Sequence, residues 1–211
     1  MAKTPSTMKL TLGAPVPNFT LPVTNAYNNN NTTGTETSIN LHEDCTKSSE
    51  LRGGVIVFTC NHCPFAKHIA DVLSEIANEY LPQGIKFYAI NSNDADRFPQ
   101  DSPEAMAVEA KRRGFNFPYL FDETQNTAKA YYAACTPDVF VFDKALKLYY
   151  CGGIDETTPN KEGIKAHGKY LKSALTSLLA GDPPPSNQQP SIGCNIKWKP
   201  GNAPAYFAEA P

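Results

Sequence analysis

The sequence predicts an α/β domain whose mixed central β-sheet is flanked by helices on both faces and followed by an irregular C-terminal tail. Strand-like apolar runs alternate with amphipathic helical patterns along most of the chain, and two strands follow one another directly near residue 145. The segment 182–211 is rich in proline. We therefore expect a disordered leader at 1–9, one domain at 10–181, and a linker with a tail at 182–211.

The first half of the domain is expected to contain one extended segment, one insertion and the first strand–helix unit. Three prolines between residues 15 and 22 exclude a helix there. A polar insertion at 25–38 has little apolar surface to bury, so we expect it to be exposed and mobile. The apolar run Val55–Phe58 predicts a strand buried on both faces, and a helix with one apolar stripe follows at about 61–80.

The second half repeats the alternation and then ends in a strand pair and a helix. Capping residues, proline and glycine mark the boundaries of these elements. They are a strand at 85–90, a helix opened by Ser102 and Pro103 and ended by Gly114, a strand at 117–121, a helix at 124–132, two antiparallel strands at 139–142 and 146–151, and a helix at 163–179.

Charge and hydropathy exclude several classes of function. The formal net charge of −2, from 19 basic and 21 acidic residues, gives no basis for binding nucleic acid or an anionic membrane. No apolar run reaches the roughly 20 residues that span a bilayer, and the N-terminus has no hydrophobic signal core. We therefore expect a cytoplasmic protein. Its six cysteines then indicate redox or metal chemistry rather than a disulfide framework.

The strongest chemical signal is the pair Cys60 and Cys63, which lies where the first buried strand leads into its helix. Two intervening residues let the two sulfurs of such a pair form a disulfide. The free N–H groups and positive dipole of a helix N-terminus favour thiolate and lower a cysteine pKa to roughly 3.5–7.5. His62 can add positive charge or a hydrogen bond. Half of a zinc site and two inert core cysteines are the other interpretations, but no second ligand pair with zinc-like spacing follows.

Three further residues are candidates for the same site. Thr136-Pro137 directly precedes the strand at 139–142, and a cis-proline there would lie opposite the reactive helix and expose the Thr136 backbone to a thiol substrate. Cys135 would then be close to the pair, either as a third redox thiol or as a small packing residue. Cys194 lies in the tail, where it either resolves a disulfide from a flexible arm or anchors the tail; we prefer the anchor.

These motifs resemble the thioredoxin-like superfamily, and within it a little-characterised subgroup of the peroxiredoxin-like redoxins related to alkyl hydroperoxide reductase and thiol-specific antioxidant proteins. The resemblance is carried by GAPVPNFTL at 13–21, FTCNHCP at 58–64, Thr136-Pro137 and IGCNIKWK at 192–199. It extends from about residue 10 to 199. It implies a thioredoxin-like fold and a thiol antioxidant or oxidoreductase activity, with protein or small-molecule disulfides and thiols, or peroxides, as partners.

The resemblance leaves two assignments of the reactive cysteine open. Aligned with thioredoxin, Cys60 is the exposed nucleophile and Cys63 resolves the mixed disulfide. Aligned with peroxiredoxins, Thr59 and Cys63 match a Thr-x-x-Cys-Pro motif, so that Cys63 attacks peroxide and Thr59 hydrogen-bonds to it. The peroxiredoxin proline is absent, because Ile56 stands there, and no arginine can be assigned to the thiolate. The adjacent pair favours dithiol exchange started by Cys60.

Two further alternatives are copper(I) delivery, since thiolates and imidazole suit that ion, and a binding module without catalysis. The spacing of the cysteines differs from that of the copper chaperones which the motif faintly resembles. We expect thiol–disulfide exchange that needs no organic or metal cofactor.

Overall fold

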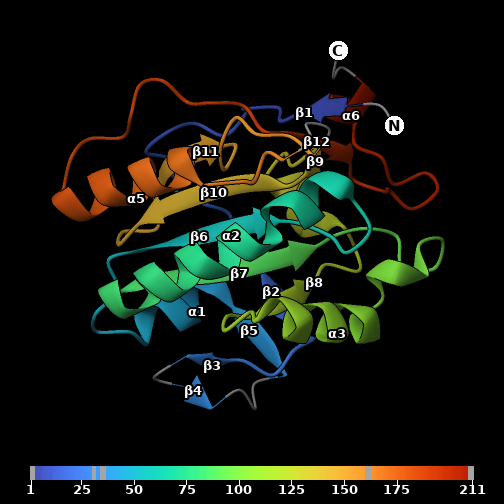
Figure 1. Cartoon of the computed structure of the whole chain (residues 1–211), viewed down its shortest axis with the longest axis horizontal. Helices are drawn as coiled ribbons and strands as arrows, with labels where there is room; N and C mark the ends of the chain where they lie inside the picture. The colour runs from blue at the N-terminus through green and yellow to red at the C-terminus, as the bar shows by residue number, and fades with distance from the viewer. Residues whose placement is uncertain (1–2, 30–31, 34–36, 160–162, 209–211) are drawn as a thin grey trace.

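A central sheet of five strands organises the fold, and a computed structural model describes it for residues 3–29, 32–33, 37–159 and 163–208. The strand order is β11-β10-β6-β7-β8 (Figure 1). The strands are β6 (Gly53–Phe58), β7 (Ile85–Asn91), β8 (Tyr119–Phe121), β10 (Asp138–Asp143) and β11 (Leu148–Gly152). β6, β7 and β8 run parallel, and β10 is antiparallel to both of its neighbours. The predicted mixed sheet is confirmed.

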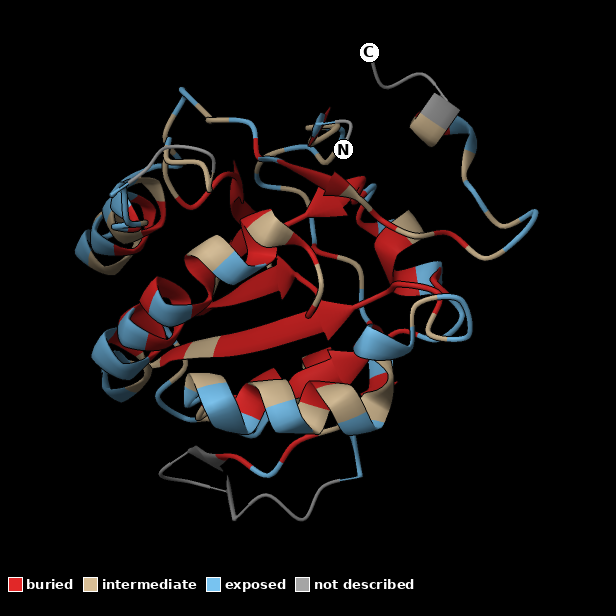
Figure 2. Ribbon diagram, turned by 45° about the vertical axis from the view of Figure 1, so that its right-hand side comes forward, coloured by how far each residue is buried: buried red, intermediate tan, exposed pale blue. Residues whose placement is uncertain are grey.

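Helices cover both faces of this sheet, as predicted. On one face, α2 (Pro64–Tyr80), α3 (Pro103–Arg113) and α5 (Lys169–Ala180) pack their apolar side chains in one core cluster with β6, β7 and β10. On the other face, α1 (Leu41–Thr46) and α4 (Asn126–Ala130) pack with residues from both ends of the chain. Figure 2 shows the strands buried and the helices turning an exposed strip outward, as expected for amphipathic helices.

Two predicted helices begin later than their sequence patterns indicate. α2 begins at Pro64 rather than near residue 61. α5 begins at Lys169 rather than near 163, because Gly168 adopts a left-handed φ of 73° and its amide donates to Asp155. α3 follows the prediction: the Ser102 hydroxyl caps its first turn, and Gly114 ends it with a φ of 66°. β8 and α4 are shorter than predicted.

The N-terminal segment contradicts the predicted disordered leader, whereas the C-terminal tail is held on the domain, as the anchoring role preferred for Cys194 requires. β1 (Lys3–Pro5) pairs with β12 (Ile192–Asn195), and β12 pairs with β9 (Cys135–Thr136), which gives a second sheet in the order β1-β12-β9. The segment 3–9 is therefore not a loose leader, and the tail is docked on the domain. Trp198 and Tyr206, the latter in α6 (Ala205–Ala208), are buried in the core. Residues 1–2 and 209–211 lie outside the described residues.

The polar insertion is more anchored than its composition predicts. Asn25 and Tyr27 are buried, and the Asn25 side chain bonds to the backbone of both Phe117 and Tyr119. β3 (Asn28–Asn29) pairs with β4 (Thr32–Thr33), and β2 (Thr20–Pro22) pairs with β5 (Ser38–Asn40). Residues 30–31 and 34–36 of the insertion lie outside the described residues. Among the described residues, no helix is long and apolar enough to cross a membrane.

Candidate active site

The cysteine pair lies at the carboxyl end of β6, the central strand of the sheet, where α2 begins. Cys60 follows two residues after β6, and Cys63 is the N-cap of α2 with Pro64 as the first helical residue. The predicted strand-to-helix junction is confirmed. The predicted exposure of Cys60 is wrong, because Cys60 is 5% exposed and Cys63 0%. The two residues form a small buried cluster with Phe65, Ala66 and Cys194.

A buried carboxylate explains why the helix begins at Pro64. Asp101, at the end of the 3₁₀ helix η2 (Pro99–Asp101), accepts the Asn61 amide at 2.8 Å and bonds His62 Nδ1 at 2.5 Å. These bonds hold residues 61 and 62 outside the helix. The His62 ring also stacks on Phe98 with centroids 5.3 Å apart. His62 Nδ1 is therefore bonded to Asp101, and the effect expected of His62 on the thiolate stays a prediction.

The late start of α2 places the thiolate at Cys63. A hydrogen bond from the Cys60 thiol is the main cause that lowers the pKa of Cys63 to about 5, although burial opposes it. The thiol of Cys194 and the amides of Ala66 and Cys194 lower this pKa further. Burial, the hydrogen bond to Cys63 and the charge of Asp101 together raise the pKa of Cys60 well above its usual value. The electrostatics therefore favour Cys63, not Cys60, as the attacking sulfur.

The Thr136–Pro137 peptide bond is cis and lies at the pair, as predicted. The hydroxyl of Thr136 is 3.3 Å from Cys60 Sγ. The carbonyl oxygen of Thr136 is 3.3 Å from Cys63 Sγ and accepts a hydrogen bond from Cys63 when that thiol is protonated. The backbone of Thr136 is not open to a substrate, however. β12 already pairs with it, with Cys194 opposite Thr136. In this conformation β12 occupies the backbone edge that a substrate would use, and the substrate-binding role expected for Thr136 and Pro137 stays a prediction.

Cys135 and Thr59 contribute less to the site than the sequence suggests. The Cys135 thiol lies 3.7 Å from the Pro137 carbonyl, and burial with the charge of Asp138 raises its pKa well above the usual value. Its thiol is therefore protonated. The Thr59 amide donates to Ile90 at 2.8 Å, and no hydrogen bond within the described parts of the chain joins the Thr59 hydroxyl to Cys63. The peroxiredoxin-type contact from Thr59 is absent there.

One group of side chains at the site has the composition of a metal centre. Ligand atoms of Cys60, His62 and Asp101 lie within 4.8 Å of one another. However, His62 Nδ1 and Asp101 already bond each other, and Asp101 also accepts from Asn93 at 2.8 Å. A metal ion on this set would have to replace the hydrogen bond that holds residues 61 and 62 in place. The set is better explained as a support for the thiols.

Two acidic residues of the site, Asp101 and Asp138, were not predicted from the sequence. Asp101 stood in a polar loop without any motif, and the only signal was that this loop follows the carboxyl end of a predicted parallel strand. Asp138 follows the cis-proline and is 1% exposed. Burial raises the pKa of Asp138 well above its usual value, and the nearby Ser191 hydroxyl and Val139 amide lower it by a smaller amount. Neither carboxyl oxygen of Asp138 has a hydrogen bond of normal geometry within the described residues.

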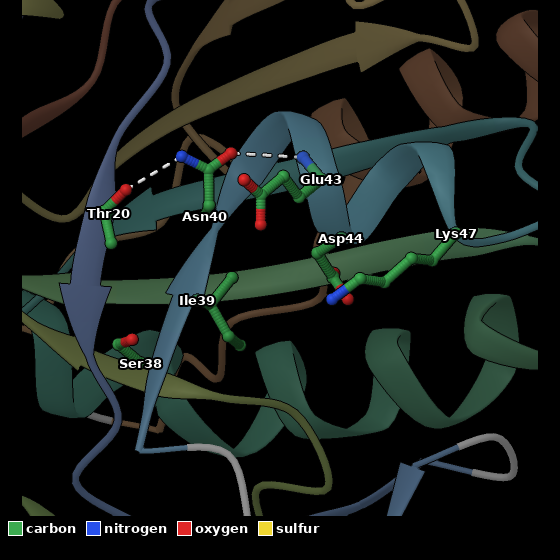
Figure 3. A pocket seen from close by; sticks show the side chains of 7 residues that line it. All are labelled: Thr20, Ser38, Ile39, Asn40, Glu43, Asp44 and Lys47. Atoms are coloured by element: carbon green, nitrogen blue, oxygen red, sulfur yellow. Dashed lines mark hydrogen bonds between the residues drawn. The ribbon is translucent and has the colours of Figure 1, made fainter.

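The surface around the thiols offers little room. A hollow of about 20 Å³, lined by Phe65, Pro137 and Ile192 among others, lies near the start of α2 and the cis-proline, and neither Cys60 nor Cys63 lines it. It has the size of one or two water molecules. A larger cavity of about 160 Å³ lies between β2, β5 and α1 (Figure 3). There Asn40 joins the Thr20 hydroxyl to the Glu43 amide and caps α1, and no cysteine lines it.

We predict that Asp101→Asn destabilises the fold by about 2–3 kcal/mol, because it weakens the charge-assisted hydrogen bonds of a buried group. Asp71→Asn is the matched control: Asp71 is 74% exposed and pairs with Arg113 on the surface, so its loss costs about 1 kcal/mol or less. Urea unfolding at pH 7 measures both. Equal costs for the two variants would contradict the structural role of Asp101.

Comparison with known proteins identifies the family of the chain. The model of the AhpC/TSA family matches residues 12–151. A structure of an uncharacterised conserved protein from Geobacillus kaustophilus is 46% identical, with 95% of this chain and 98% of that chain covered and a TM-score of 0.84. A hypothetical protein from Sinorhizobium meliloti is 37% identical, with 94% and 100% covered and a TM-score of 0.83. The comparison with curated proteins found no match.

More distant structures share the fold. A thioredoxin-like protein solved in its oxidised form is 18% identical, with 83% of this chain and 99% of that chain covered and a TM-score of 0.55. This likeness confirms the predicted thioredoxin-like fold.

Proposed function

The chain belongs to the AhpC/TSA family, and we propose that it is a dithiol redox enzyme in which Cys63 attacks a small hydroperoxide and Cys60 resolves the oxidised sulfur. The observation that carries this proposal is the position of Cys63 as N-cap of α2, with a pKa of about 5. At neutral pH this sulfur is a thiolate, and the thiolate is the nucleophilic form of cysteine. Cys60, whose pKa is raised, donates to it as a neutral thiol.

The chemical steps use only the two cysteines and the oxidant. The Cys63 thiolate attacks one oxygen of the hydroperoxide, the O–O bond breaks, and the other oxygen leaves as water or an alcohol after taking up a proton. Cys63 becomes a sulfenic acid. Cys60 then attacks the Cys63 sulfur, hydroxide leaves as water with the proton of Cys60, and a Cys60–Cys63 disulfide forms. An external dithiol returns the disulfide to two thiols by exchange.

The surroundings of the pair favour a small oxidant over a protein disulfide. Cys60 and Cys63 are at most 5% exposed, and the hollow near the start of α2 has room for only one or two water molecules. A polypeptide substrate would add a strand beside Thr136, where β12 already pairs. Hydrogen peroxide needs no such pairing.

Thiol–disulfide exchange started by Cys60 is the second candidate. It is favoured by the contact of 3.3 Å between Cys60 Sγ and the Thr136 hydroxyl beside the cis-proline. In this candidate β12 must leave the Thr136 edge before a protein substrate can bind.

Rapid mixing of the reduced protein with different oxidants tests the proposal. We expect one equivalent of hydrogen peroxide to be consumed per chain, at a rate at least tenfold above that for an unstructured disulfide peptide at equal concentration. A faster reaction with the peptide would favour the second candidate. Tight copper(I) binding with no fast oxidation by either oxidant would support the metal-binding alternative and overturn both.

A further inference from the structure

The C-terminal strand β12 lies where a substrate strand would lie in the second candidate function. It runs antiparallel to β9, with Cys194 opposite Thr136 and Asn195 opposite Cys135. On its other side it pairs with β1, with Lys3 opposite Cys194. β12 is therefore the middle strand of a three-stranded sheet, and a cysteine of the same chain occupies the place of an incoming cysteine.

The sequence of β12 is adapted to this close approach. A Cβ atom on Gly193 would lie 2.1 Å from the Thr136 carbonyl oxygen and 3.1 Å from the Pro137 nitrogen, so no other residue fits without displacing the strand. The Ser191 hydroxyl donates to Gly152 at 2.5 Å, and the Ser191 amide donates to the Ser6 hydroxyl at 3.0 Å. These contacts fix the strand just before Cys194.

Cys194 itself belongs to the thiol cluster. It is 2% exposed and packs with Cys60, Cys63, Phe65 and Ala66. Its thiol and its backbone amide both interact with the Cys63 sulfur. Cys63 therefore has one thiol from its own turn and another from the C-terminal strand as neighbours. An anchoring role alone, which we preferred from the sequence, does not require a sulfur at this contact.

We propose that Cys194 is a third redox thiol, which β12 holds next to Cys63 in the place of a substrate cysteine. This proposal rests on the proposed function only in that Cys63 is the sulfur that becomes oxidised. In the step, Cys194 attacks Cys63 of the Cys60–Cys63 disulfide. The Cys60–Cys63 bond breaks and a Cys63–Cys194 bond forms. Cys60 leaves as a thiolate and takes up the proton that Cys194 gives up, so no net electrons are exchanged.

The charges at the cluster suit this order of events. Burial is the first cause that raises the pKa of Cys194, to about 12, followed by its hydrogen bond to Cys63 and the charge of Cys63. The second and third causes disappear when Cys63 is oxidised. Cys194 then ionises more easily, after Cys63 has reacted and not before. Lys197, three residues further along, lowers the same pKa by its charge.

Disulfide mapping tests the proposal directly. Trypsin releases Cys60 and Cys63 together in the peptide 53–67, and Cys194 in the peptide 173–197. The protein is oxidised with one equivalent of hydrogen peroxide or, separately, of diamide, then acid-quenched, alkylated and digested. We expect cross-linked 53–67 and 173–197 in wild type beside the internal 53–67 disulfide, and the cross-link as the main product in Cys60→Ser. Cys194→Ser loses it, and the control Cys151→Ser keeps it.

Each other outcome has a definite meaning. The proposal is overturned if Cys194 stays alkylated in oxidised Cys60→Ser while near-ultraviolet circular dichroism shows the variant folded. It is also overturned if wild type yields only the internal disulfide with both oxidants. Cross-linking by diamide without reaction with peroxide would support the third thiol and contradict the peroxide substrate, so the two proposals fail separately.

Discussion

Replacing Cys63 by serine removes peroxide reduction, whereas replacing Cys60 by serine leaves the first turnover in place. Cys63 is the sulfur at the N-terminus of α2 and has the lowered pKa, so its loss removes the nucleophile and costs at least ~1,000-fold in rate. Cys60→Ser still contains a hydroxyl at this position. That hydroxyl can still donate a hydrogen bond to the Cys63 thiolate, so the attack on peroxide proceeds, and the oxidised Cys63 is left to be resolved by Cys194, the remaining cysteine of the cluster.

Stopped-flow measurement of a single turnover, followed by dimedone trapping, separates these steps. In Cys60→Ser we expect sulfenic acid on Cys63 or its bond to Cys194; in Cys63→Ser we expect neither. Cys151→Ser, on β11 and outside the thiol cluster, serves as a matched control with wild-type kinetics. A single turnover that survives in Cys63→Ser and is lost in Cys60→Ser would assign the attack to Cys60 instead.

Gly193→Ala is expected to displace β12 and expose the thiols. The added methyl group would lie 2.1 Å from the Thr136 carbonyl oxygen, and overpacking of this kind costs about 1–3 kcal/mol. The clash either lowers the stability of the whole protein or separates β12 from β9. Both make Cys63 and Cys194 react faster with a bulky maleimide under native conditions.

Gly201→Ala is the control for this experiment. Gly201 lies in the same C-terminal segment with a φ of 73° and open space around its Cα. Alanine there costs about 1 kcal/mol through the left-handed backbone alone and leaves the thiols protected. If maleimide modified both variants equally fast, β12 would not be what shields the site.

The sheet and most helices could be predicted because their signals are local. The run Val55–Phe58 is apolar throughout and β-branched at three positions, and β6 is buried along its whole length. Ser102 and Gly114 mark both ends of α3 by capping chemistry that acts within one turn. The pairing of β1 with β12 was missed because these two strands lie at opposite ends of the chain. Neither strand has more than four residues, too few for a periodic pattern.

The site was predicted in its composition but not in its electrostatics. Cys60, Cys63 and the cis Thr136–Pro137 bond follow from spacing and order along the chain. Asp101 bonds Asn61 and His62, shifts the start of the helix by three residues and raises the pKa of Cys60 by its charge, which favours the thiolate at Cys63. A single carboxylate some forty residues away leaves no pattern near the cysteines, so the sequence favoured Cys60.

The pH dependence of alkylation at Cys63 tests the central claim most directly. Its pKa is about 5, against roughly 8.5 for an ordinary cysteine. A depressed pKa keeps the thiolate fraction constant above that value and reduces it as pH falls. The rate of iodoacetamide modification at Cys63, assigned by tandem mass spectrometry, should therefore be flat between pH 6.5 and 8 and fall to half near pH 5. A rate that rises about tenfold per pH unit from 6.5 to 8, or modification that falls on Cys60 instead, would contradict the assignment of Cys63 as the attacking thiolate.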